Sequence, residues 1–155
     1  MTEEVSRLLE TGSETIVRAW TQKVASDKRV QSDAQLDYLQ LIDHVPQILE
    51  ELRAALARDA HPNTGSLHKG LEHGRQRWRQ GYELKEVIRE LMLLRSTLME
   101  YVETAREELS AQTFDQLTHA YRQINGFMDE ELYKTVEAYL AAPREARAAE
   151  SVAAY

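Results

Sequence analysis

The chain contains no cysteine, and this absence excludes several kinds of chemistry. Disulfides, thiolate metal sites and cysteine nucleophiles all need the missing residue. The sequence also has no Gly-x-Ser-x-Gly nucleophile motif and neither type of glycine-rich phosphate-binding loop. We therefore expect a domain that is not an enzyme and has no catalytic residues. The lack of cysteine also suits a cytoplasmic protein.

Glycine, proline and long hydrophobic runs are scarce as well. The 155 residues include 6 Gly and 3 Pro, and 43% of them are hydrophobic, which is typical of one globular helical domain. No run approaches the ~20 apolar residues that span a bilayer. The formal net charge of −7 argues against binding to nucleic acid or to anionic lipid. We expect neither nucleic acid nor a membrane among its partners.

Apolar residues recur along the chain at three- and four-residue steps, which is the spacing of amphipathic helices. Strand-like alternation is absent from the sequence. The pattern predicts an all-α fold of about five helices with a four-helix-bundle core. The predicted helices cover about 2–25, 34–58, 65–80, 83–108 and 111–141.

Proline and glycine predict where these helices break. Pro46 lies inside the second helical pattern, so we expect a kink or a fresh helix start near Asp43–His44. A turn is expected within 57–66, and Gly81 should end the third helix as a C-terminal glycine cap.

The end of the chain has a different composition. The fifth helix should stop before Pro143, and the alanine-rich tail 143–155 follows. The tail is either a frayed end or the start of a helical linker to an output domain outside this sequence. The domain prediction is therefore a sensory or input domain over 1–142 and such a linker over 143–155.

The stretch HGRQRWRQGYEL, residues 73–84, gathers aromatic and basic side chains. Gly74 and Trp78 fall on the apolar stripe of their helix, so we assign them to packing. His73 and Arg77 share a different face and form a polar pair. A structural role for this pair is favoured over a ligand-binding role.

Two further polar residues lie on or beside apolar stripes. Arg95 lies between Leu91 and Leu98, so its charge needs a partner. The partner is either a carboxylate of a neighbouring helix in a buried bridge, which we favour, or an anionic ligand. His44 is placed to bond a carbonyl that Pro46 leaves free, and a structural role is again the preferred interpretation.

Metal and haem sites find little support. His68 and Glu72 have a spacing that can chelate, but neither His-Glu-x-x-His nor paired Glu-x-x-His motifs occur. No histidine is distinguished as a haem ligand. We predict no metal site, and the sequence requires no cofactor.

Three blocks of the sequence together resemble the N-terminal domain of RsbR/RsbRD-type co-antagonist proteins, a domain that also heads many bacterial sensor histidine kinases. The blocks follow the patterns Asp-His-x-Pro, His-Gly-x-x-Arg-x-x-x-Gly and Glu-x-x-x-Leu-Arg, and the resemblance covers about residues 3–140. They are met by Asp43, His44 and Pro46, by His73, Gly74, Arg77 and Gly81, and by Glu90, Leu94 and Arg95, with Trp20 at the expected tryptophan.

The resemblance implies a non-catalytic sensory domain of a bacterial signal-transduction protein. It also leaves a globin-like arrangement open beside the simple bundle. The output in cis that we favour is a kinase core, which would make the whole protein a histidine kinase of a two-component system, and the alternative is a STAS domain of a stress-response co-antagonist. We expect a homodimer that relays a signal by helix repacking. The alternative is a small-molecule, metal or haem sensor, whose candidate ligand-binding residues are His44, His73, Arg77, Trp78 and Arg95.

Overall fold

A computed structural model describes residues 2–42, 44–58, 68–108 and 114–153. Within these ranges the chain is helical and has no strand, which confirms the all-α prediction. The turn expected within 57–66 lies almost entirely outside the described residues. The elements are α1 (Thr2–Ser26), η1 (Ser32–Gln35), α2 (Tyr38–Ile42), α3 (Val45–Ala57), α4 (His68–Arg79), α5 (Leu84–Thr104), η2 (Ala105–Glu108) and α6 (Phe114–Ala153).

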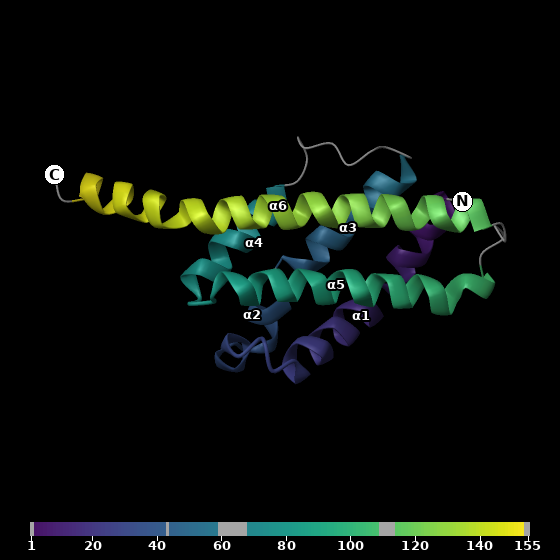
Figure 1. Ribbon diagram of the computed structural model, residues 1–155, viewed down its shortest axis with the longest axis horizontal. Helices are drawn as coiled ribbons and strands as arrows, with labels where there is room; N and C mark the ends of the chain where they lie inside the picture. The colour runs from purple at the N-terminus through teal and green to yellow at the C-terminus, as the bar shows by residue number, and fades with distance from the viewer. Residues whose placement is uncertain (1, 43, 59–67, 109–113, 154–155) are drawn as a thin grey trace.

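The longest helices set the shape of the molecule. Figure 1 shows α5 and α6 side by side and antiparallel along the long axis. In this view α1 and α3 lie behind these two helices. α6 packs chiefly against α4 and α5, and α1 packs against α3 and α5. The largest fully buried apolar side chains include Trp20, Ile48, Leu94, Ile124 and Phe127. None of the described helices is both long and apolar enough to cross a lipid bilayer.

The break predicted at Pro46 is a fresh helix start. α2 ends at Ile42 and α3 begins at Val45, so Pro46 occupies the first turn of α3. A proline is tolerated there because the first amides of a helix have no intrahelical acceptor. The second predicted helix is therefore two helices, and 3-10 helix η1 precedes them.

Gly81 ends α4 as predicted. Its φ of +79° is a left-handed conformation that glycine adopts without strain. The amide of Gly81 donates to the carbonyl of Trp78 at 3.1 Å, and the amide of Tyr82 donates to the carbonyl of Arg77 at 3.0 Å. This pair of bonds is a Schellman cap, which turns the chain from α4 into α5.

The prediction that the last helix stops before Pro143 is wrong. α6 runs from Phe114 to Ala153 with Pro143 inside it. A proline removes one backbone hydrogen bond and costs about 3 kcal/mol, but the cost is local. Alanine and leucine before Pro143, and arginine, glutamate and alanine after it, are strong helix formers, so the helix continues across the defect.

Candidate functional site

A buried ion pair lies where α4 meets α5. Arg77 of α4 and Glu90 of α5 are both fully buried, and Arg77 Nε donates to Glu90 Oε2 at 2.9 Å. Two charges leave water here, and only their mutual contact and further hydrogen bonds offset that loss of hydration. The surroundings of the pair therefore decide its role.

The other donors of Arg77 hold the end of α2. Nη1 donates to the carbonyl of Gln40 at 3.2 Å and to Gln80 Oε1 at 2.6 Å, and Nη2 donates to the carbonyl of Leu41 at 2.5 Å. Carbonyls in the last turn of a helix have no intrahelical partner. Arg77 supplies the donors that the break before α3 has removed.

The bond that the sequence analysis expects from the His44 ring to a freed carbonyl stays a prediction, and the structure adds a contact with a neighbouring helix. The His44 backbone precedes α3, and its Nδ1 lies 3.5 Å from Oε2 of Glu72 on α4. The ring therefore faces a carboxylate of the neighbouring helix. Two carbonyls at the end of α2, those of Gln40 and Leu41, accept from Arg77.

His73 completes the buried group, which we call the Arg77 cluster and define as His73, Arg77 and Glu90. The His73 side chain is 1% exposed, and its Nε2 lies 3.4 Å from Glu90 Oε2. Neither ring nitrogen makes a hydrogen bond to any described residue. Burial lowers the pKa of His73, so the imidazole is neutral near neutral pH. Burial opposes the charge of Glu90, but His73 and Arg77 outweigh it and lower the pKa of that carboxyl.

Aromatic residues connect the Arg77 cluster to the rest of the bundle. Trp20 of α1 is 1% exposed, and its indole N–H donates to the carbonyl of Glu90 at 2.9 Å. The guanidinium of Arg77 lies 4.9 Å from the centre of the Tyr82 ring, in cation–π geometry. Contacts from α1, α2, α4 and α5 thus converge on one buried group.

The structure brings together some of the predicted site residues and separates others. His44, His73 and Arg77 lie near one another. Besides burial, the charges of Arg77 and His44 act to lower the pKa of His73, which requires both to be close to its ring. Trp78 is only half-buried on α4. Arg95 lies elsewhere, and its Nη2 donates to Oδ1 of Asp129 on α6 at 2.5 Å. This is a bridge to a neighbouring helix, but it is exposed and not buried as expected. Ligand binding by these five residues stays a prediction.

The contacts of Glu90 were not predicted from the sequence, although Glu90 belongs to the third block of the family resemblance. A usable signal existed, since Glu90 lies three residues after Val87 and four before Leu94, on the buried stripe of α5. A carboxylate on such a stripe needs a cation. Arg77 supplies it, but the fold alone shows which arginine does so.

Another buried carboxylate, on α6, was not predicted from the sequence. Glu131 of α6 is fully buried, and neither of its oxygens has a hydrogen-bond partner within the described residues. Burial, followed by the nearby Glu51 of α3, raises the pKa of Glu131 to about 8. This carboxyl is therefore protonated at neutral pH.

The described residues contain no group of three or more histidine or carboxylate side chains that could hold a metal ion. The family model described as RsbT co-antagonist protein rsbRD N-terminal domain matches residues 14–153. That span includes the whole Arg77 cluster and all of α6. Searches of curated proteins and of solved structures found no match to this chain.

Proposed function

Because this chain belongs to the family of RsbT co-antagonist protein rsbRD N-terminal domains, we propose that it is the non-catalytic sensory domain of a stress-response signalling protein. A STAS domain is the proposed output in cis, because the family description names a co-antagonist. A histidine kinase core is the second candidate, and autophosphorylation of the full-length protein with ATP distinguishes the two.

Helix α6 is the observation that carries this proposal. It packs against α3, α4 and α5, so a change in any of them reaches it. Ala142 is the last buried residue among those of α6 whose exposure the structure describes, while Arg144, Ala149 and residues 151–153 are exposed. Figure 1 shows this end of α6 extending past the bundle. A helix that contacts the bundle and then leaves it is suited to carry a signal to an output domain.

The Arg77 cluster supplies the physical basis for two packings. Its ion pair and the carbonyls of α2 form one connected set of contacts across several helices. Buried polar groups cannot slide gradually, because intermediate positions leave them without partners. The helices around the cluster therefore move between discrete arrangements, which is what a switch requires.

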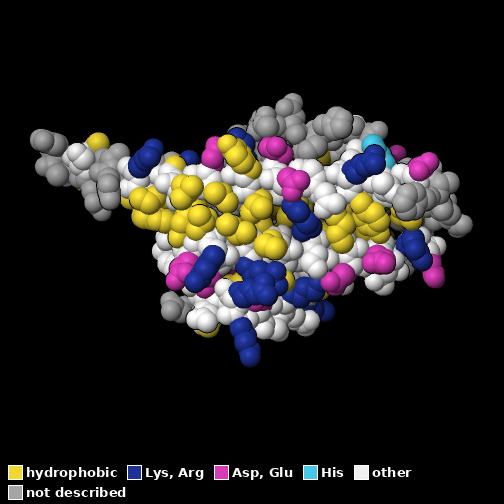
Figure 2. Space-filling view, viewed as in Figure 1, with side chains coloured by type: hydrophobic (Ala, Val, Ile, Leu, Met, Phe, Trp, Pro, Cys, Tyr) yellow, Lys and Arg dark blue, Asp and Glu magenta, His cyan; other side chains and the backbone are white. Residues whose placement is uncertain are grey.

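The proposed homodimer uses the face formed by α5 and α6. Figure 2 shows a band of hydrophobic side chains along the line where these helices lie side by side. We call it the α5–α6 band. It consists of partly or largely exposed residues on the two helices, namely Leu84, Ile88, Met92, Met99, Leu132, Val136 and Leu140. Leu140 and Met92 are 59% and 49% exposed, which makes them the natural contacts of a second copy.

Cysteine crosslinking tests whether the chain dimerises and whether the two α6 helices of the dimer run parallel. The chain has no cysteine, so Ala149→Cys introduces a single thiol on the exposed end of α6. A short bismaleimide should join two copies of this variant, because a parallel dimer places the two α6 ends together. Gln22→Cys, an exposed position on α1, is the matched control and should crosslink poorly. Equal crosslinking of both variants would contradict the proposal.

A further inference from the structure

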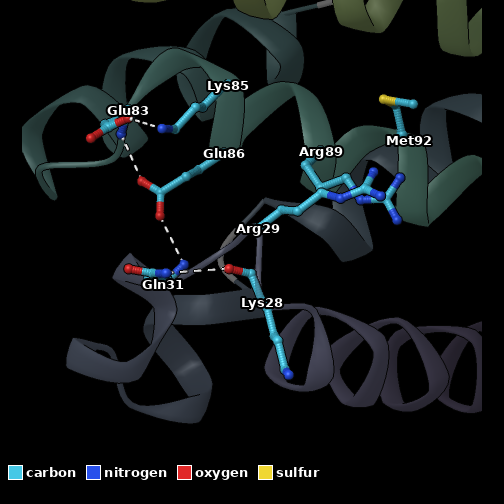
Figure 3. A pocket seen from close by; sticks show the side chains of 8 residues that line it. All are labelled: Lys28, Arg29, Gln31, Glu83, Lys85, Glu86, Arg89 and Met92. Atoms are coloured by element: carbon cyan, nitrogen blue, oxygen red, sulfur yellow. Dashed lines mark hydrogen bonds and ion pairs between the residues drawn. The ribbon is translucent and has the colours of Figure 1, made fainter.

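A cavity of about 430 Å³ lies at the beginning of α5, against the segment that joins α1 to η1 (Figure 3). This volume falls in the range of small-molecule sites. The cavity is lined by Lys28, Arg29 and Gln31 from the joining segment and by Glu83, Lys85, Glu86, Arg89 and Met92 from α5 and its N-terminal flank. It lies apart from the Arg77 cluster, and none of the predicted site residues lines it.

Glu86 fixes the two walls of the cavity to each other. Its Oε1 accepts hydrogen bonds from the amides of Gln31 and Ser32 at 2.8 and 3.0 Å, and its Oε2 accepts one from the Ser32 hydroxyl at 2.8 Å. Burial acts to raise the pKa of Glu86, but these donors outweigh it and hold that pKa below its usual range. The Glu86 carboxylate is therefore engaged within the fold, and the walls are already in place before any ligand arrives.

The charges along the cavity are unevenly matched. At one end, Lys85 Nζ lies 2.9 Å from Glu83 Oε2, so these two side chains pair with each other. At the other end, Arg89 Nε donates to Asp27 Oδ2 at 2.8 Å. The Arg29 side chain makes no hydrogen bond or close ion pair with any residue that the structure describes. Its backbone amide bonds to Asp27, and its charge also acts on that carboxylate.

In Figure 3 the side chains of Arg29 and Arg89 both extend toward the Met92 end of the cavity, while the Lys28 side chain points away, and the charges of both arginines act on Asp27. Only the Nε of Arg89 bonds to Asp27, so its terminal N–H groups remain available. Asp27 is one carboxylate beside two guanidinium groups, so it balances only one of their two positive charges, and their mutual repulsion favours a second anion. This excess of positive charge occurs on a chain whose formal net charge is −7.

We propose that Arg29 and Arg89 bind a small organic oxyanion, either a carboxylate or a phosphate monoester, whose apolar part contacts Met92. The fork of a guanidinium matches the paired oxygens of these groups, and such charge-assisted bonds are the strong ones. Met92 supplies an apolar surface beside the two cations.

The position of Met92 gives the bound anion a route to the rest of the molecule. Met92 belongs to the α5–α6 band as well as to the cavity. An occupied cavity therefore changes the edge of the proposed dimer surface. This consequence rests on the proposed sensory function, whereas binding of the anion does not.

Titration of the purified chain tests the binding. Inorganic phosphate and succinate are added at fixed ionic strength, and binding is followed by calorimetry and by the backbone amide NMR signals of Arg29, Arg89 and Met92. We expect saturable binding that shifts these signals. Arg29→Gln should weaken it about tenfold, since one charged partner is lost. Arg89→Lys should also weaken it, because lysine keeps the charge and loses the fork.

Arg79→Gln, an exposed arginine on α4, is the matched control and should bind like the unaltered chain. Tighter binding of succinate identifies a carboxylate ligand, and tighter binding of phosphate identifies a phosphate monoester. No saturable binding of either anion, or an equal loss in Arg79→Gln, would overturn the proposal. Circular dichroism confirms that each variant is folded. Crosslinking of Ala149→Cys without anion binding would leave the proposed function standing and remove only this inference.

Discussion

Arg77 is the residue on which the centre of the bundle depends. Replacing it with methionine keeps much of the side-chain volume but leaves Glu90 buried without its cation. We expect Arg77→Met to lower the free energy of unfolding by about 3–5 kcal/mol, the usual cost of breaking a buried pair. Urea denaturation measures this, and Arg79→Met on the exposed side of α4 should change it by less than about 0.5 kcal/mol.

Removing the charge of Glu90 as well separates the ion pair from the contact with α2. In the double variant Arg77→Met/Glu90→Gln no unpaired charge remains, so part of the lost stability should return. The carbonyls of Gln40 and Leu41 still lack their donor, so the recovery should be incomplete. Full recovery would show that Arg77 contributes nothing by holding α2.

Glu131 gives the protein an unusual dependence on pH. Its pKa is about 8 in the folded chain against an ordinary value of 4.5. Between these two values the unfolded chain has released a proton that the folded chain keeps, so this group destabilises the fold increasingly as pH rises. Below about 4.5 both states are protonated, and its contribution no longer changes.

The variant Glu131→Gln keeps a neutral side chain at every pH and removes this dependence. We expect its stability advantage over the unaltered chain to grow from about pH 5 to about pH 8, measured by urea denaturation at each pH. Glu137→Gln, at a more exposed site on the same helix, should give a small difference that does not grow. Parallel stability curves for Glu131→Gln and the unaltered chain would contradict the raised pKa.

At the scale of elements, two glycines allow helices to approach closely, and they differ in what they meet. A Cβ at Gly74 of α4 would collide with the backbone carbonyl of Thr135 on α6. A Cβ at Gly12 of α1 would instead collide with the end of the Tyr101 side chain on α5. A side chain can rotate away, whereas a helix backbone has to move as a whole.

We therefore expect Gly74→Ala to lower the free energy of unfolding by about 1–3 kcal/mol, the range for overpacking. Gly12→Ala should cost less, because Tyr101 can move and alanine gains helix propensity. Thermal and urea denaturation of the two variants compare them directly. A larger loss for Gly12→Ala would show that α4 and α6 have room to separate.

The same elements show how far sequence alone reaches. The cap at Gly81 and the break at Pro46 were predictable, because each depends on the conformation of a few neighbouring residues. The pairing of Arg77 with Glu90 was not, because a stripe shows that a charge is buried without showing which helix faces it. The predicted helix end before Pro143 was wrong, because the rule for proline gives its local cost and not the helix propensity of the residues around it.

At the scale of the whole molecule, the α5–α6 band predicts the oligomeric state. Leu140→Glu puts a charge at the most exposed leucine of the band, and we expect it to convert dimers to monomers. Light scattering coupled to gel filtration measures the mass. Leu39→Glu is the matched control, since Leu39 on α2 is 73% exposed and lies outside the band. A dimer that survives Leu140→Glu would move the interface elsewhere.

The continuity of α6 through Pro143 has a consequence for any domain attached to it. An α-helix turns by about 100° per residue, so the rotational phase of the attached domain depends on the number of residues between it and the bundle. Inserting seven residues after Ala149 restores nearly the original phase, whereas inserting two points the attached domain to the opposite side. In proteins that join this chain to an output domain, the strength of signalling should therefore vary periodically with the number of inserted residues. A flexible linker in place of the helix would abolish this periodicity.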